Sequence, residues 1–193
     1  MAEKINTNSL ENQFLVAMPQ LEGSYFADTV TYLWKHNEDG AIGIVINKPL
    51  QLREVDIFDE LKIDYKVEQQ QMTIKRQVLS GGPVERDKGF IIHDSLDEWE
   101  SSINVTPEIK ICTSKSILQD IARGKGPKNY LIALGCAGWE AGQLEQEIIK
   151  NSWLTVPANP KLIFSQSHSS KLTEAAGILG VNIRQLPQEA GHS

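Results

Sequence analysis

The stretch that decides the fold is Leu134-Gly135-Cys136-Ala137-Gly138-Trp139-Glu140-Ala141-Gly142-Gln143-Leu144-Glu145. The apolar run that leads into it, residues 130–134, predicts a buried strand. Gly135 and Gly138 predict a tight turn after that strand, because glycine accepts positive φ and lets two backbones approach closely. Leu144 and Ile148 lie one turn apart in a helix, so the pattern predicts a helix that buries both. Such junctions often hold ligands, since N–H groups at a helix start point outward. The stretch therefore locates a candidate site but names no reaction.

Length and composition indicate one globular domain over residues 1–193, with residues 1–9 as a flexible N-terminus. Hydrophobic residues make up 40% of the chain and charged residues 23%, which suffices for a sizeable core. The net charge of -6 offers no general attraction to phosphate backbones or anionic lipids. The start lacks the basic and apolar regions of a signal peptide, so we expect none, and no apolar run approaches the roughly 20 residues that span a bilayer. Two cysteines imply no disulfide framework, so we expect a cytoplasmic protein without direct membrane contact.

The N-terminal half predicts strands at residues 14–18 and 41–47 from their apolar runs. Between them, Phe26, Val30, Leu33 and Trp34 recur at i, i+4, i+7 and i+8, which favours an amphipathic helix. A short helix is expected around residues 55–61. Residues 64–72, which contain three successive glutamines, are expected to form an exposed connection.

The C-terminal half mixes hairpin and strand–helix patterns. Residues 77–79 and 89–93 predict two arms of a hairpin around the turn Ser80-Gly81-Gly82-Pro83. Further strands are expected at residues 103–105, 109–112, 153–156 and 161–164. Ser114 is a helix cap before Ile117, Leu118 and Ile121, and a last helix covers residues 172–179. This order predicts a mixed sheet with flanking helices, in the α+β or α/β class.

Cys136 is the residue with the most evident nucleophilic potential. A helix start beyond it would lower a thiol pKa, whereas the nearby Glu140 would raise it, and free cysteine is commonly buried. A structural role is therefore the default interpretation. Ser80 with His93 and Asp94 has the residue types of a catalytic triad, but the chain has no G-x-S-x-G elbow.

Metal and nucleotide signatures are missing from the sequence. The four histidines, His36, His93, His168 and His192, lie far apart and form no H-E-x-x-H motif. The glycine turns at 81–82 and 135–138 match neither nucleotide-binding pattern, so we expect no cofactor and no metal. Arg123, Lys125 and Lys128 form the main basic cluster, while the predicted helix at 140–150 is acidic, so direct nucleic-acid binding is not expected.

Several motifs together resemble the YqgE/AlgH family of bacterial proteins. They are Phe14-Leu15-Val16-Ala17-Met18-Pro19, Gly40-Ala41-Ile42-Gly43-Ile44-Val45-Ile46-Asn47-Lys48-Pro49, Gly81-Gly82-Pro83-Val84, Gly89-Phe90-Ile91-Ile92-His93, Leu134-Gly135-Cys136-Ala137-Gly138-Trp139, Gly142-Gln143-Leu144-Glu145 and Asn151-Ser152-Trp153-Leu154. The resemblance covers residues 10–193, including the ending Gly191-His192. It implies one domain whose sheet curls into a partial barrel. Some members are labelled putative transcriptional regulators, and the resemblance carries no catalytic residues.

Two positions depart from what the resemblance implies. Family members commonly have tyrosine at the position of Cys136, and because tyrosine cannot form a thiolate, this argues against a shared thiolate chemistry. Lys48 stands where arginine is frequent, so the charge is kept but bidentate anion binding is lost.

The leading hypothesis is a non-catalytic binding or regulatory protein that recognises a small ligand or a protein partner. Strand ends are where α/β sheets bind ligands, so the candidate cleft comprises Asn47, Lys48, Gly81, Gly82, Arg86, His93, Gly135, Cys136, Gly138 and Trp139. The alternatives are a hydrolase with His93 as general base and a regulator that binds DNA directly. We expect a monomer or a weak homodimer.

Overall fold

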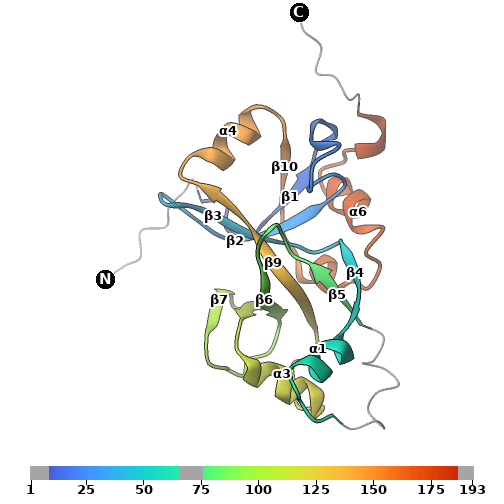
Figure 1. The fold of residues 1–193 in the computed structure, drawn as a ribbon. Helices are drawn as coiled ribbons and strands as arrows, with labels where there is room; N and C mark the ends of the chain where they lie inside the picture. Colours follow the sequence, from blue (N-terminus) through green and yellow to red (C-terminus); the bar gives the residue numbers. More distant parts are fainter. Residues whose placement is uncertain (1–8, 66–75, 187–193) are drawn as a thin grey trace, which may run out of the picture.

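A long strand, β9 (Tyr130–Glu140), lies at the centre of the fold in this computed structural model, which describes residues 9–65 and 76–186. The second half of β9 pairs antiparallel with β3 (Gly40–Val45). Its first half lies between β5 (Gln77–Ser80), which is parallel to it, and β6 (Val84–His93), which is antiparallel. Leu79 and Phe90 both pair with Ala133, one from each side. β9 thus runs through both halves of the molecule (Figure 1).

The first half is an antiparallel sheet in the order β10-β1-β2-β3, which continues into β9. Its strands are β1 (Gln13–Ala17), β2 (Val30–Asn37), β3 and β10 (Trp153–Pro157). Phe14 and Val16 belong to one hydrophobic cluster with residues of α5 (Pro160–Phe164) and α6 (Lys171–Gly177). Leu15 and Ala17 belong to another cluster with α4 (Gln143–Ile149). Both faces of this sheet are therefore buried, which explains its nearly continuous apolar runs.

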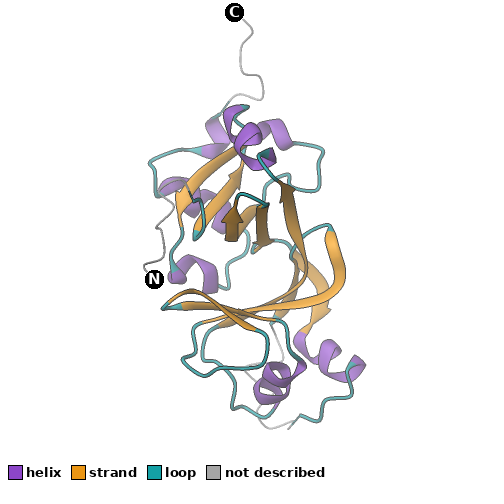
Figure 2. Cartoon of the chain, turned by 90° about the vertical axis from the view of Figure 1, so that its left-hand side faces the viewer, coloured by secondary structure: helices purple, strands orange, loops and turns teal. Residues whose placement is uncertain are grey.

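The second half carries β4 (Pro49–Arg53), β5, β6, β7 (Ser102–Thr106) and β8 (Ile109–Cys112). α1 (Glu54–Glu60) and α3 (Lys115–Ala122) pack on it, with Phe58 and Ile117 in one cluster with Ile132 of β9. Figure 2 shows helices at both ends of the molecule and strands between them.

All strands join one sheet in the order β10-β1-β2-β3-β9-β6-β8-β7, with β4 and β5 beside this path. Only the β5–β9 pair is parallel among the described strands. The sheet curls as a half-barrel with flanking helices. The expected α+β fold with a mixed, curled sheet is confirmed.

The helix predicted from Phe26 to Trp34 is wrong, because this segment enters β2. Residues 30–34 are all buried. A strand that is buried on both faces has no polar alternation, so its apolar residues matched a helical period by chance.

Two further local predictions are also corrected. Residues 161–164 form helix α5 rather than a strand, because the Asn159 side chain caps it by accepting a hydrogen bond from the Leu162 amide at 2.9 Å. The segments at 77–79 and 89–93 do not form a hairpin, because β9 lies between β5 and β6.

The central stretch turns later than expected. β9 continues through Gly135 and Gly138 to Glu140, and the turn into α4 falls at Gly142, whose φ is +74°. The other predicted strands and helices are present within a few residues of their expected positions. The expected flexible tail falls mainly in residues 1–8, and the expected connection mainly in residues 66–75, both outside the described residues.

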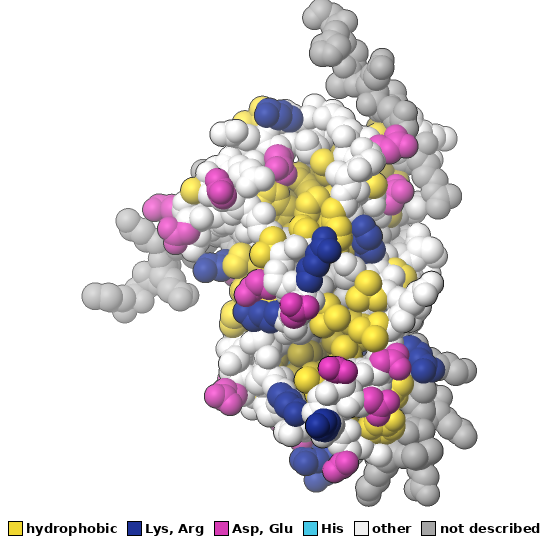
Figure 3. All heavy atoms as spheres, in the orientation of Figure 1, with side chains coloured by type: hydrophobic (Ala, Val, Ile, Leu, Met, Phe, Trp, Pro, Cys, Tyr) yellow, Lys and Arg dark blue, Asp and Glu magenta, His cyan; other side chains and the backbone are white. Residues whose placement is uncertain are grey.

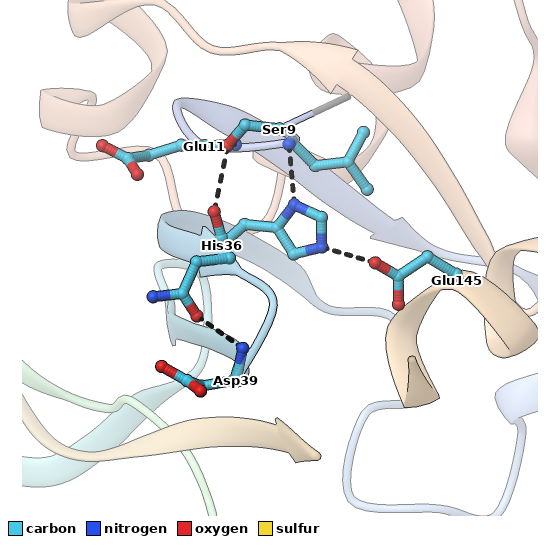
Figure 4. A network of polar contacts seen from close by, with 7 residues as sticks. Ser9, Glu11, His36, Asp39 and Glu145 are labelled. Atoms are coloured by element: carbon cyan, nitrogen blue, oxygen red, sulfur yellow. Dashed lines mark hydrogen bonds and ion pairs between the residues drawn. The ribbon is translucent and has the colours of Figure 1, made fainter. Parts of the chain in front are cut away.

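The start of the described chain is held by His36 of β2 (Figure 4). Nδ1 of His36 accepts the Leu10 amide at 2.9 Å, and its Nε2 lies 2.7 Å from a Glu145 carboxylate oxygen. Because Nδ1 accepts a hydrogen bond from an N–H group, the ring proton is on Nε2, which donates a hydrogen bond to Glu145. The network ties residues 9–10 to both β2 and α4.

Candidate functional site

The two glycine segments predicted to form a cleft, at 81–82 between β5 and β6 and at 135–138 within β9, lie directly against each other. The Gly81 amide donates to the Leu134 carbonyl at 2.8 Å, and its own carbonyl accepts the Val45 amide at 2.8 Å. A Cβ on Gly82 would lie 1.9 Å from the Cys136 carbonyl carbon, and one on Gly81 would lie 2.3 Å from the Gly135 oxygen. Glycine is required here because backbones touch. The contact fills the space between the two glycine segments.

Cys136 has no environment that favours a thiolate. Its side chain is buried, and the nearest polar partner is a Glu85 carboxylate oxygen at 3.9 Å. Burial and the Glu85 charge raise the pKa of the Cys136 thiol, although Lys88 opposes them. A packing role accounts for these observations.

Lys48 and Arg86 lie near Tyr25, a residue that sequence reasoning did not single out. Lys48 Nζ donates to the Tyr25 carbonyl at 2.7 Å and lies 3.9 Å from the centre of its ring. The Tyr25 hydroxyl lies 2.6 Å from the Ser80 hydroxyl. Burial raises the pKa of Tyr25, while Ser80 and the Arg86 charge lower it. In Figure 3, basic and acidic side chains lie across the middle of the molecule beside hydrophobic patches.

Trp139 and His93 lie away from the glycine contact. Trp139 is buried between β9 and α4, where its indole Nε1 donates to Glu147 at 2.9 Å. Gly138 precedes it on β9. His93 pairs with Tyr130 at the other end of β9, roughly 20 Å along the strand from Cys136.

The environment of His93 keeps its imidazole neutral. The side chain is 0% exposed and contacts Trp99 edge to face. Its Nδ1 accepts the Ser95 amide at 3.3 Å, and its Nε2 has no hydrogen-bond partner. Burial and the Lys110 charge lower the pKa of His93 to about 4, against Asp94 and Asp97.

A pocket of about 600 Å³ opens between the end of β1 and the start of α6. It contains Asn47 from the predicted set. The Asn47 side chain accepts the Val30 amide at 2.8 Å and donates to the Asp28 carbonyl at 2.8 Å, so its orientation is fixed. The pocket walls are formed by Ala17, Met18, Pro19, Glu22, Ala27, Asp28, Asn47, His168, Ser169, Leu172, Ile183 and Leu186.

His168 separates this pocket from a narrow slot on its other side. The slot is lined by Glu54, Arg76, Tyr130 and Gln166 among others. Nδ1 of His168 is buried without a hydrogen-bond partner. Burial and the neighbouring Lys171 lower the pKa of His168, while the Ile46 backbone raises it.

Glu54 and Tyr130 form a buried polar pair beside the slot. The Tyr130 hydroxyl donates to a Glu54 carboxylate oxygen at 2.7 Å. Arg76 lies over the Tyr130 ring, 4.1 Å from its centre. Burial raises the pKa of Glu54 to about 7, although Tyr130 and Arg76 lower it.

The pocket was missed in the sequence because its walls come from distant segments. A weak signal existed in the last helix, where Lys171 shares a buried face with Ala175 and Ala176. A lysine on an otherwise apolar face is uncommon. In the described parts of the chain, no group of three or more His, Cys, Asp or Glu side chains could hold a metal ion. No helix among the described residues is long and apolar enough to cross a membrane.

Comparisons of the sequence with family models and with known proteins agree on one family. A model of a family described as AlgH-like matches residues 14–184. A UPF0301 protein of Hahella chejuensis is 45% identical over 186 residues, 96% of this chain and 97% of that protein. One from Ralstonia nicotianae is 44% identical over 185 residues, covering 96% of each chain.

Two solved structures share the fold. The solution structure of the AlgH protein from Pseudomonas aeruginosa has a TM-score of 0.78 and 42% identity, and each chain is covered completely. A crystal structure of a Corynebacterium diphtheriae protein has a TM-score of 0.61 at 18% identity, with 95% of this chain and 90% of that one covered. The second likeness concerns the fold alone.

Proposed function

We propose that this chain, which belongs to the AlgH-like family, is a cytoplasmic, non-catalytic protein. In this proposal it binds a small molecule in the pocket at the start of α6. The observation that carries this proposal is the pocket of about 600 Å³, whose walls combine polar side chains such as Asn47 with apolar ones such as Leu172 and Ile183. Ligand sites of soluble proteins have this size and mixed lining. Any regulatory role then acts through the occupied and empty states of this pocket.

The fixed orientation of the Asn47 side chain in the pocket wall supports ligand binding. Asn47 is held by two hydrogen bonds, one to β2 and one to the connection before it. A fixed amide costs little conformational entropy when a ligand binds, because its rotamer is already selected. Leu172 and Ile183 supply apolar contacts beside it.

The geometry favours binding over hydrolysis. A general base must reach its substrate. His93 is 0% exposed, and its pKa of about 4 leaves the imidazole a weak base. Direct DNA binding has equally little support, because the net charge is -6.

A thermal-shift screen of metabolites, nucleotides and phosphates tests the proposal. A ligand present at about 100 times its dissociation constant should stabilise the fold by roughly 2.7 kcal/mol. The pocket-filling variant Leu172→Trp should abolish this stabilisation. Leu179→Trp is the matched control, since Leu179 is 48% exposed and does not line the pocket. A ligand that stabilises the wild type and Leu172→Trp equally would place the site elsewhere and refute the proposal.

A further inference from the structure

Strand β7 forms an open edge of the sheet. It is the last strand in the sheet order and pairs with β8 on one side, while none of the other described strands pairs with its opposite side. Figure 1 shows it at the outer margin of the second half. An edge strand has backbone N–H and C=O groups that point away from the sheet, so an extended segment can add to it as a further strand.

The residues of β7 do little to prevent such an addition. Proteins protect sheet edges with charged side chains, prolines or bulges. The strand Ser102–Thr106 contains no charged residue and no proline. Its pairing with β8 is regular from Ser102 to Asn104, and the register shifts between Asn104 and Thr106. Residues 102–104 therefore remain a regular, neutral edge.

Apolar side chains are exposed on both faces of this edge. Ile103 pairs with Ile111 and Asn104 pairs with Lys110, so Ile103 and Asn104 point to opposite faces of the sheet. Ile103 is 45% exposed on its face. On the other face, Asn104 lines a groove of about 440 Å³ together with Leu96, which is 85% exposed. The remaining walls of this groove are Val105, Thr106, Pro107 and Lys110.

The loop that carries Leu96 is anchored on both sides of this residue and to the groove. Lys110 Nζ donates to the Leu96 carbonyl at 3.2 Å, and the Trp99 indole N–H donates to Asp120 at 2.9 Å. The Ser102 amide donates to the Trp99 carbonyl at 3.2 Å. A surface that is ordered before binding loses little conformational entropy when a partner binds.

The charges around the edge are acidic. Asp97, Glu98 and Glu100 before the strand and Glu108 after it are exposed. None of the ion pairs formed by the described residues includes one of these carboxylates. Lys110, the cation of the groove, is only 7% exposed. The edge is therefore an apolar strip between carboxylates.

We propose that β7 binds an extended peptide segment of a partner protein as an added strand, and that this segment has apolar residues between flanking lysines or arginines. Its side chains alternate between the two faces, so one set lies beside Ile103 and the other beside Leu96 in the groove. Its basic ends lie against the carboxylates. This surface is separate from the pocket at the start of α6, because no residue of β7 lines that pocket.

A second copy of the chain fits this edge less well. Antiparallel pairing of two β7 strands, centred on Asn104, brings Glu100 of each copy opposite Glu108 of the other. Like charges directly opposite each other destabilise a strand pair. The acidic surroundings thus favour a basic partner over self-association.

The test uses the full chain and three short peptides with acetylated and amidated ends. The first is Lys-Lys-Val-Ile-Val-Lys-Lys, the second has glutamate in place of every lysine, and the third has three prolines in place of Val-Ile-Val. The third keeps the charge but has no N–H donors in its centre. In NMR titrations at low salt, the first peptide should shift the Ile103 and Asn104 amides and slow hydrogen exchange along β7. It should bind about tenfold or more tightly than the other two.

Variants of the protein test the apolar strip and the charges separately. Ile103→Lys should weaken binding of the first peptide by about tenfold or more, because a cation then replaces an apolar contact. Ile149→Lys is the matched control, since Ile149 is 79% exposed on α4. Glu100→Lys combined with Glu108→Lys should shift the preference to the glutamate peptide, whereas Glu60→Lys, at an exposed position of α1, should not.

Three results would overturn the proposal. Equal binding of the proline peptide would show that charge alone attracts the probe, without strand addition. Absence of binding, or shifts confined to residues outside β7 and the groove, would exclude this surface. Dimerisation of the free protein in analytical ultracentrifugation, abolished by Ile103→Lys, would assign the edge to a second copy of the chain.

Discussion

Trp139 and Trp153 donate their indole N–H groups to the same carboxylate oxygen, Oε2 of Glu147, at 2.9 Å and 2.8 Å. The two rings meet edge to face, with their centres 5.8 Å apart. Trp139 lies on β9 and Trp153 on β10, at opposite margins of the first half of the sheet. One side chain of α4 therefore connects two strands that do not pair with each other.

This shared acceptor predicts a large effect of Glu147→Ala on stability. The substitution leaves two buried indole N–H groups unsatisfied, each at a cost of about 1–3 kcal/mol. We expect the free energy of unfolding to fall by about 2–6 kcal/mol in urea denaturation followed by tryptophan fluorescence. Gln146→Ala, at the exposed preceding position, should change it by less than about 0.5 kcal/mol. Similar values for both variants would contradict the shared-acceptor explanation.

The contact between the two glycine segments, residues 81–82 and 135–138, predicts different outcomes for two alanine substitutions. Gly82→Ala puts a methyl group 1.9 Å from the Cys136 carbonyl carbon, so backbone must move. We expect destabilisation by more than about 3 kcal/mol. Gly138→Ala meets no heavy atom within 4 Å and should change stability by less than about 1 kcal/mol. Thermal unfolding of both variants measures the difference, and a tolerated alanine at residue 82 would show that the two glycine segments are not in contact.

Glu54 predicts a pH dependence of stability on the acidic side of neutrality. Its pKa is about 7 in the folded protein against an ordinary 4.5, so the folded state binds more protons between these values. The contribution of Glu54 to stability therefore falls as pH rises from about 4.5 to about 7. Glu54→Gln should remove this fall and stabilise the protein above pH 7 by on the order of 2 kcal/mol. Glu60→Gln, exposed on the same helix, should behave as wild type; equal pH profiles for wild type and Glu54→Gln would refute the assignment.

His93 predicts the opposite slope over an overlapping range. Its pKa is about 4 in the folded protein against an ordinary 6.5, so the unfolded chain binds the extra proton between them. Its contribution to stability is lost as pH falls through this window. His93→Asn retains an acceptor near the position of Nδ1 and should flatten this part of the profile. An NMR titration in which the His93 ring titrates near 6.5 would contradict the buried, neutral state.

The strands of the curled sheet could largely be predicted, but their neighbours could not. The apolar run at residues 130–134 identifies β9 as buried, yet nothing local shows that β5 and β6 flank it on opposite sides. Pairing between distant strands depends on side-chain packing across the whole sheet. The segment around Trp34 shows the same limit, because burial on both faces removes the alternation that marks a strand.

The sequence marks the glycine positions as special, but it does not show their role. A tight turn and a close backbone contact both require glycine, and only the coordinates distinguish them at Gly82. Asn47 alone of the predicted set lines the pocket, because that site is completed by segments more than a hundred residues away. Ordinary side chains such as Leu172 acquire a role there only through their neighbours.

Because β9 belongs to both halves of the sheet, the chain has no boundary at which it could be divided into two independently folding parts. A fragment ending before residue 130 would lack the partner of β3, β5 and β6 together, and one beginning there would carry β9 with all three missing. Slow-exchanging amides should therefore be found on both sides of β9 with a common protection energy, since neither half opens without exposing the strand that the other half needs.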